Sequence, residues 1–330
     1  MKDSFPFTHQ SHSPVQGGCE VGSPLCFVLD AYKAVETVET ARQLGIFTQL
    51  EAGACTVEAL SRACGTTPKS MKCILDALSA LGCLRASEDG YSLPWPDLDR
   101  LLRRQSPGGQ IMRHLQHGAP LNPIDTPRGA RLYFPENTMD SARLMMHYAE
   151  AFAPLIARPA LQILDLGAGG IPWSKALLAL SPDCQVLAVD FPEVMLKTRA
   201  LVEKAGLGAQ FDFVEGNVLE VHLPPGAFDL ILMGNLCQRF DTETNIALLK
   251  QNAKRLRTGG RLAIIDFFLP GEKLSTSETL HALNMLSQTT HGEVHSVKEC
   301  IEWLTEAGFT KIHYHLLSGQ AKPTLVLAEL

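Results

Sequence analysis

The sequence predicts an α/β protein in which a doubly wound sheet of seven strands, the last antiparallel, follows a mainly helical winged-helix domain. Over residues 161–330, short and nearly continuous apolar runs alternate with helical segments, as in a parallel sheet covered on both faces. Residues 26–105 instead carry apolar side chains at helical spacing and end in a short hairpin. At 330 residues, the chain is also long enough for two domains.

The segment before the helical domain, residues 1–25, is polar and contains several prolines and glycines. Such a composition is typical of a flexible tail. Phe5 and Phe7 would be unusual in a fully solvated tail, so a lid over the active site remains the alternative.

Residues 26–105 predict three helices and a two-stranded wing. Apolar side chains recur three and four residues apart from Val28 to Ala41, which predicts the first helix. Thr56 and Thr67-Pro68 are start signals for the second and third helices. Asp89-Gly90 then marks the turn of the hairpin.

A winged helix often binds DNA, but the charge pattern argues against it here. The third helix offers only Lys69 and Lys72 as cations, and the whole chain carries a net charge of −6. Phosphate binding needs concentrated positive charge. We therefore expect this domain to form a homodimer and expect no nucleic-acid partner.

Residues 106–160 predict a connector that ends in a strong helix over residues 139–156. Met145 and Tyr148 share one face of that helix, which would enter the second domain beside the ligand. Together with Tyr133, they are candidates for the roof of a substrate pocket.

Residues 161–330 predict the seven strands. Five apolar runs, each separated by a helical or turn-forming segment, occupy residues 161–167, 184–191, 211–216, 228–235 and 260–268. Two further strands are expected at residues 311–317 and 324–330. The short connection between these two forces an antiparallel hairpin at the sheet edge.

Polar residues and glycines stand where these strands end, which is where open α/β sheets bind ligands. Asp165 ends the first strand and is followed by Gly167 and Gly169, whose backbones let a ligand approach closely. Asp190 ends the second strand 25 residues later, where a carboxylate can accept both hydroxyls of a ribose.

The third and fourth strands are followed by amide side chains, Asn217 and Asn235. A dinucleotide enzyme is the competing interpretation, but Pro172 stands where its motif requires a third glycine. Asp165, just before the glycines, suits an amino-acid-like group better than phosphates. The pattern therefore favours an adenosyl sulfonium cofactor, S-adenosylmethionine (SAM).

The chain resembles small-molecule O-methyltransferases of the caffeate and acetylserotonin type over most of its length. The motifs that carry the resemblance lie at residues 165–169, 189–194, 215–217, 234–250, 256–266 and 303–309. The resemblance implies the class I SAM-binding fold with a winged-helix dimerisation domain. It further implies contacts to the methionyl part of SAM from Asp165, Gly167 and Gly169, to the ribose from Asp190, and around the adenine from Phe191, Asn217 and Val218, with Asn235 a further candidate.

The departures from this family concern the catalytic residues. Gln238 stands where family members usually have a general-base histidine, and glutamine cannot take a proton near neutral pH. His291 is a candidate replacement, with Asn284 and Met285 in the same pocket-lining stretch. Ile171 also replaces the third glycine of the first motif.

We therefore expect SAM-dependent methyl transfer to a small-molecule acceptor of secondary metabolism that needs little general-base help. The alternative is a cyclase in which the amine of SAM attacks its own Cγ, releasing methylthioadenosine and azetidine-2-carboxylate. Azetidine-carboxylate synthases are similar methyltransferase-fold proteins.

The remaining expectations concern metals and location. His313 and His315 alternate on a predicted edge strand, but a third metal ligand cannot be placed, so we expect no metal. The nine cysteines are scattered without a C-x-x-C pair, and because Met1 to Gly22 lack an apolar core and no apolar run reaches membrane-span length, we expect neither a signal peptide nor a membrane span. We expect a cytoplasmic protein without a membrane partner.

Overall fold

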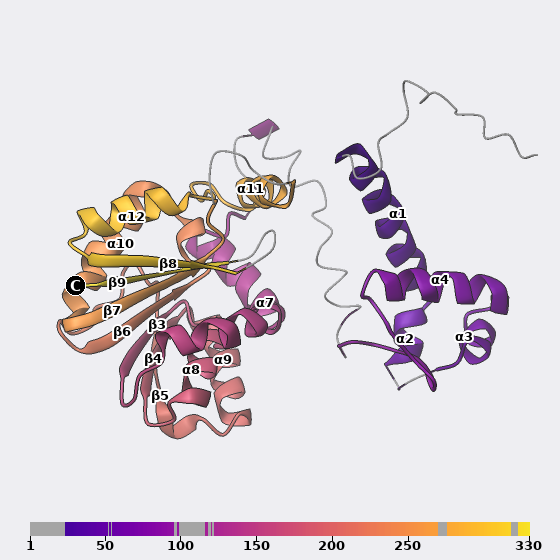
Figure 1. Ribbon diagram of the computed structural model, residues 1–330, viewed down its shortest axis with the longest axis horizontal. Helices are drawn as coiled ribbons and strands as arrows, with labels where there is room; N and C mark the ends of the chain where they lie inside the picture. The colour runs from indigo at the N-terminus through magenta and orange to yellow at the C-terminus, as the bar shows by residue number, and fades with distance from the viewer. Residues whose placement is uncertain are drawn as a thin grey trace, which may run out of the picture. The chain divides into compact units, whose positions relative to one another are not determined.

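The computed structural model describes residues 24–51, 53, 55–95, 98, 116–117, 120, 122–269, 276–317 and 323–330. The chain divides into two compact units, Met1–Ser106 and Pro107–Leu330, each described by itself (Figure 1). The lid or tail expected over residues 1–25 lies outside the described residues up to residue 23. Among the described helices, none combines the length and apolar character needed to cross a bilayer.

In its described residues up to 95, the first unit forms four helices and a hairpin. Their bounds are α1 (Pro24–Gln43), α2 (Ile46–Leu50), α3 (Val57–Ala63), α4 (Pro68–Ala80), β1 (Arg85–Ser87) and β2 (Gly90–Ser92). Thr56 and Thr67 cap α3 and α4 as their sequence signals indicate, each accepting a hydrogen bond from a backbone N–H of the first turn. The short helix α2 was not predicted, because Gly45, with φ 74°, ends α1 and the chain re-enters a helix at once.

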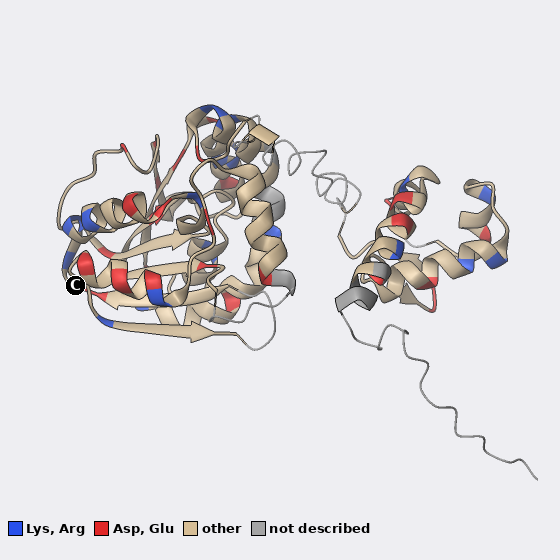
Figure 2. Cartoon of the chain, turned by 90° about the horizontal axis from the view of Figure 1, so that it is seen from above, with Lys and Arg blue, Asp and Glu red and all other residues tan. Residues whose placement is uncertain are grey.

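The surface of this unit carries both signs of charge. Figure 2 shows acidic and basic residues interspersed along the described helices of both units. Lys72, one of the two cations expected on α4, is 2.5 Å from the Asp76 carboxylate, and the Tyr91 hydroxyl donates to the same carboxylate. One of the two lysines on this helix is therefore already paired within the protein.

The second unit is built on a seven-stranded sheet in the order β5-β4-β3-β6-β7-β9-β8. The strands are β3 (Gln162–Leu166), β4 (Gln185–Asp190), β5 (Phe211–Glu215), β6 (Phe228–Gly234), β7 (Leu256–Asp266), β8 (Thr310–Leu316) and β9 (Thr324–Glu329). Strand β9 runs antiparallel to both of its neighbours, and the predicted fold class is confirmed. The last strand lies inside the sheet, between β7 and β8, and β8 forms the edge.

Helices cover both faces of this sheet (Figure 1). Helices α10 (Thr242–Arg255) and α12 (Val297–Glu306) pack on one face, and α7 (Pro127–Ile156), α8 (Pro172–Leu180) and α9 (Pro192–Lys204) pack on the other. The central strands β3 and β6 are buried between the two layers. Helix α11 (Thr276–Gln288) and the short helices η1 (Gly208–Gln210) and η2 (Cys237–Arg239) also belong to this unit.

Helix α7 is longer than the sequence predicts. It begins at Pro127 rather than near residue 139, and Thr126 caps it by accepting a hydrogen bond from the Gly129 N–H at 3.2 Å. Pro135 lies inside the helix, and an internal proline ordinarily indicates a helix end. The extra turns bring more side chains over the carboxyl ends of the strands.

Helix α7 also packs very closely against the loop that follows β3. A Cβ atom on Gly170 would overlap the Ala142 Cβ and would lie 3.2 Å from the Thr138 carbonyl oxygen, both on α7. The contact between this helix and the sheet therefore requires the absence of a side chain at residue 170.

We expect Gly170→Ala to lower the thermal unfolding midpoint of the protein, because the added methyl group must push α7 away at a cost of about 1–3 kcal/mol. Gly208→Ala is the matched control, since a Cβ there meets nothing within 4 Å. Differential scanning calorimetry measures both variants, and equal midpoints for them would contradict the packing argument.

Candidate functional site

A cavity opens at the carboxyl ends of β3, β4, β5 and β6. Its lining comes from the loop after β3, from the segments after the other three strands, and from the first half of α7. Of the side chains and glycines predicted for the site, the cavity is lined by Gly167, Gly169, Asp190, Phe191, Asn217, Val218, Asn235, Tyr133 and Met145.

The loop after β3 has left-handed backbone at three alternate residues. Gly167 and Gly169 have φ of 68° and 49°, and Ile171 has φ of 55°. The position after the two glycines therefore keeps the left-handed conformation although the residue is β-branched, which costs on the order of 1–3 kcal/mol. The Ile171 side chain is only 1% exposed, and its burial offsets a similar amount.

Asp190 is fixed to this loop by hydrogen bonds. One carboxylate oxygen accepts from the Gly169 N–H at 2.9 Å and the other from the Phe191 N–H at 2.8 Å. Burial raises the pKa of Asp190 to about 6, although both hydrogen bonds and the charge of Arg239 act in the opposite direction. The carboxylate thus reaches the cavity in a fixed orientation.

Asp165 lies behind the loop rather than in the cavity lining. It is 1% exposed, and the Ser174 hydroxyl donates to one of its oxygens at 2.7 Å. The other oxygen is buried without a hydrogen-bond partner among the described residues, and burial raises the pKa of Asp165 to about 7.

The two amide side chains at the strand ends differ in their surroundings. Asn217 closes a local turn, because its side-chain oxygen accepts from the Leu219 N–H at 3.1 Å and its nitrogen donates to Glu220 at 3.2 Å. Asn235 has φ of 53°, and its side-chain oxygen is buried without a partner among the described residues. Asn235 is thus the amide with an unused acceptor beside the cavity.

Gln238 faces a histidine that the sequence analysis missed. Its side-chain oxygen is 2.7 Å from Nε2 of His281, which lies on α11 and packs against the Phe267 ring at 4.9 Å. Burial, followed by the charge of Arg239, lowers the pKa of His281, so the ring is neutral near pH 7. Neither Gln238 nor His281 lines the cavity.

The structure does not bring the other predicted residues into the cavity. His291 has an exposed side chain, and its backbone N–H donates to the Asp125 carboxylate at 2.7 Å. Asn284 and Met285 lie on α11 outside the lining, and Tyr148 lies on α7 beyond Met145. The roles assigned to these residues by the sequence stay predictions, and the described residues contain no group of His, Cys, Asp and Glu suited to a metal.

Two further lining residues lacked a signal in the sequence. Trp173 is the second residue of α8, and its indole nitrogen fills the space that a side chain on Gly234 would need. Phe134 on α7 lies under the guanidinium of Arg239, 4.3 Å from carbon to ring centre. Both depend on contacts between distant segments, which local sequence patterns do not report.

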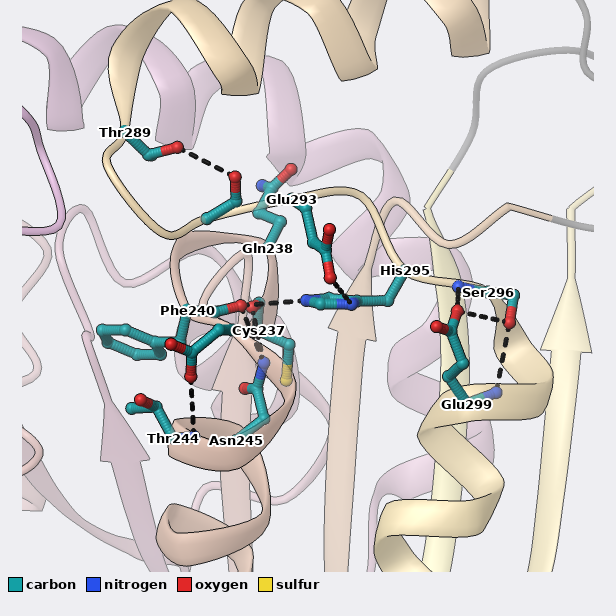
Figure 3. A network of polar contacts seen from close by, with 12 residues as sticks. Cys237, Gln238, Phe240, Thr244, Asn245, Thr289, Glu293, His295, Ser296 and Glu299 are labelled. Atoms are coloured by element: carbon teal, nitrogen blue, oxygen red, sulfur yellow. Dashed lines mark hydrogen bonds and ion pairs between the residues drawn. The ribbon is translucent and has the colours of Figure 1, made fainter. Parts of the chain in front are cut away.

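Buried polar contacts hold the turn that carries Gln238 and Arg239 (Figure 3). The Asn245 amide donates to the carbonyl oxygens of Cys237 at 2.9 Å and Phe240 at 3.1 Å. His295, 2% exposed, places Nε2 2.9 Å from the same Phe240 oxygen. These contacts tie the turn to α10 and to the segment before α12, so the turn is rigidly placed.

Comparison with known proteins identifies the family. A model of the O-methyltransferase domain matches residues 97–310, and a model of the O-methyltransferase dimerisation domain matches residues 27–94. The chain belongs to the O-methyltransferase family. This confirms the resemblance found in the sequence, and enzymes of the family take SAM as methyl donor.

Several relatives of this O-methyltransferase family member have known roles or structures. The tetracenomycin polyketide synthesis 8-O-methyltransferase TcmO of Streptomyces glaucescens is 25% identical over 88% of this chain and 91% of its own. The structure of human N-acetylserotonin methyltransferase with SAM has a TM-score of 0.70, 19% identity, and coverage of 95% of this chain and 99% of its own. PigF with S-adenosylhomocysteine (SAH) has the same TM-score, 21% identity, and coverage of 93% and 99%.

We expect the affinity for SAH to fall as pH drops through about 6. Asp190 has a raised pKa, so its carboxylate is ionised above this pH and protonated below it. The ionised form accepts hydrogen bonds from ribose hydroxyls more strongly than the neutral acid does.

Isothermal titration calorimetry between about pH 5 and pH 8 measures the effect, which should be at least about tenfold in Kd. Asp190→Asn should bind weakly at every pH and should lack this dependence. An affinity that stays constant across the range in the unsubstituted protein would contradict the role of Asp190.

Proposed function

We propose that this O-methyltransferase family member transfers the methyl group of SAM to a small-molecule acceptor, of the kind made in secondary metabolism. The observation that carries the proposal is one cavity that joins the glycine loop after β3, the Asp190 carboxylate and the aromatic side chains of α7. The relatives TcmO and PigF, both named as methyltransferases, support the same reaction class.

The residues around the glycine loop fit SAM. The backbone of Gly167 and Gly169 leaves room for the methionyl part, and the unused oxygen of Asn235 offers an acceptor for its ammonium group. Asp190 would hold the ribose hydroxyls. The adenine would lie against the segment after β5 and the ring of Phe191.

Bound SAM supplies a methyl group on a positively charged sulfur, activated toward in-line displacement. The chain contributes position, since holding the acceptor atom in line with that carbon accounts for much of the rate. Tyr133, Phe134 and Met145 on α7 and Trp173 on α8 form apolar walls suited to a flat acceptor. The same walls would limit the access of water to the reacting atoms.

We propose that general-base catalysis contributes little to this reaction. Gln238 cannot accept a proton, and its partner His281 lies outside the cavity lining. His281 is neutral near pH 7 and could take a proton, with Gln238 orienting its ring, but it lies outside the cavity lining. An acceptor that is already ionised when it binds would not need this pair.

The cyclase alternative lacks support from the relatives described above. Their names all specify methyltransferases, whereas cyclisation would consume SAM without an acceptor. We therefore propose methyl transfer alone. The two reactions are distinguished by their products, which are SAH for methyl transfer and methylthioadenosine for cyclisation.

We expect purified protein, incubated with SAM and a panel of hydroxylated aromatic acceptors, to form SAH only when an accepted compound is present. Mass spectrometry of the products measures this. Methylthioadenosine formed without an acceptor would contradict methyl transfer and would indicate cyclisation.

The same assay separates the base candidates by their variants. Gln238→Ala and His281→Phe should each lower kcat by less than about tenfold, whereas loss of a general base ordinarily costs about a hundredfold or more. His291→Ala should leave kcat unchanged because its side chain is exposed. A loss above about a thousandfold in any of the three would show that this residue is a required catalytic group.

We also propose that the enzyme is a homodimer in the cytoplasm. Helix α1 exposes Val28 at 53%, Tyr32 at 78% and Val35 at 69%, spaced four and three residues apart on one face. The dimerisation-domain match covers this helix. The cysteines in the described residues are free thiols, which a reducing compartment preserves.

We expect light scattering after size exclusion to give twice the chain mass. The double substitution Tyr32→Glu and Val35→Glu should give a monomer, because it places charge on the apolar face of α1. Leu196→Glu is the matched control, since Leu196 lies on α9 and is 69% exposed, like Val35. A monomeric wild-type protein would overturn the proposal.

A further inference from the structure

Arg239 is the one cationic side chain in the cavity lining among the described residues. It lies at the end of η2, one residue after Gln238, in the turn shown in Figure 3. Arg239 takes no part in the contacts proposed for SAM, and it is not a member of the Gln238–His281 pair. Its position therefore calls for a separate explanation.

The guanidinium is held in place from two sides. Its Nε donates to the Asn235 carbonyl oxygen at 3.0 Å, and its plane lies over the Phe134 ring at 4.3 Å. Within the part of the chain that the structure describes, its two terminal nitrogens make no hydrogen bond or ion pair to a protein group. Because Nε and the ring face fix the guanidinium, its two terminal nitrogens are held side by side and can donate to one further group.

The carboxylates near Arg239 are engaged elsewhere. Asp190 accepts from two backbone N–H groups, as described above, and Asp266 accepts from those of Gln238 at 3.3 Å and Phe267 at 2.9 Å. Asp125 accepts from the N–H groups of residues 290 and 291. Their charges stabilise the guanidinium from a distance, but none of them pairs with it directly.

Arg239 is half-buried, and a charge withdrawn from water without a direct partner is costly to keep. Burial lowers the pKa of Arg239, but a guanidinium stays charged at any physiological pH. A planar fork of this kind matches a carboxylate through two parallel hydrogen bonds. The missing partner is therefore an anion that enters the cavity from outside.

We propose that Arg239 binds a carboxylate of the acceptor, so that the acceptor of this enzyme is an aromatic acid rather than a neutral phenol. This rests on the proposed function, since it assigns the acceptor half of the same cavity. The positive sulfur of SAM adds to the attraction for an anionic acceptor. The methionyl carboxylate of SAM is the other source of the same chemistry, and the test separates the two.

The test measures binding of matched probes to the SAH-loaded protein by calorimetry. The probes are benzoate, 2-naphthoate and indole-2-carboxylate, each beside its neutral carboxamide. We expect at least one carboxylate to bind about tenfold or more tightly than its carboxamide, because a charge-assisted pair contributes more than a neutral one. Equal binding within every pair, or no binding of any carboxylate, would overturn the proposal.

Variants assign the preference to Arg239. Arg239→Gln should reduce the preference for the carboxylate over its carboxamide below about twofold. Arg239→Lys should keep part of this preference because the charge remains. Arg199→Gln is the matched control, since Arg199 also lies over a ring, Phe213 at 4.4 Å, but outside the cavity. A preference unchanged in Arg239→Gln would contradict the assignment.

The affinity for SAH distinguishes the remaining outcomes. If Arg239→Gln leaves the Kd for SAH within about threefold of wild type, the anion belongs to the acceptor. If the variant raises the Kd for SAH by tenfold or more, Arg239 binds the methionyl carboxylate and the proposal is wrong. Failure of the wild-type protein to bind SAH at all would instead overturn the proposed function, and circular dichroism confirms that each variant is folded.

Discussion

The close approach of α7 to the loop after β3 is the constraint on which the site depends. Gly169 and Gly170 let Thr138 and Ala142 come into contact with the loop, which no larger residue would allow. The glycine loop therefore lines one side of the cavity. It also packs against α7, the helix that lines another side. One contact thus sets the distance between the cofactor residues and the residues proposed to hold the acceptor.

The electrostatics around Arg239 follow a second rule, which is that the neighbouring carboxylates are each held by two backbone N–H groups, whereas the guanidinium is held by the backbone only through Nε. Asp190 and Asp266 each accept from two N–H groups, so their orientation does not depend on a salt bridge. Among the described residues, the terminal nitrogens of Arg239 have no hydrogen-bond or ion-pair partner. Gln238 cannot act as a base, and Arg239 beside it is the cation proposed to bind the acceptor.

The sequence predicted the parts of the fold and site that depend on local patterns. Alternating apolar runs placed the seven strands, and strand ends placed Gly167, Gly169, Asp190 and Asn235 at one edge. Contacts between distant segments were not predictable in this way. His281 on α11 contacts Gln238, and β9 inserts between β7 and β8. The first turns of α7 were not predicted because Pro135 lies within the helix. The same limit explains why Asn284, Met285 and Tyr148 were expected in the cavity and lie outside its lining.

The buried contacts around Asn245 and His295 have a consequence for how this protein could change its selectivity. Because they fix the backbone of residues 237–240, a substitution at 238 or 239 exchanges a side chain without re-folding the turn. The glycine loop proposed to bind SAM is a separate segment of the chain. A gene library randomised at these two codons is therefore a compact starting point for directed evolution toward new acceptors.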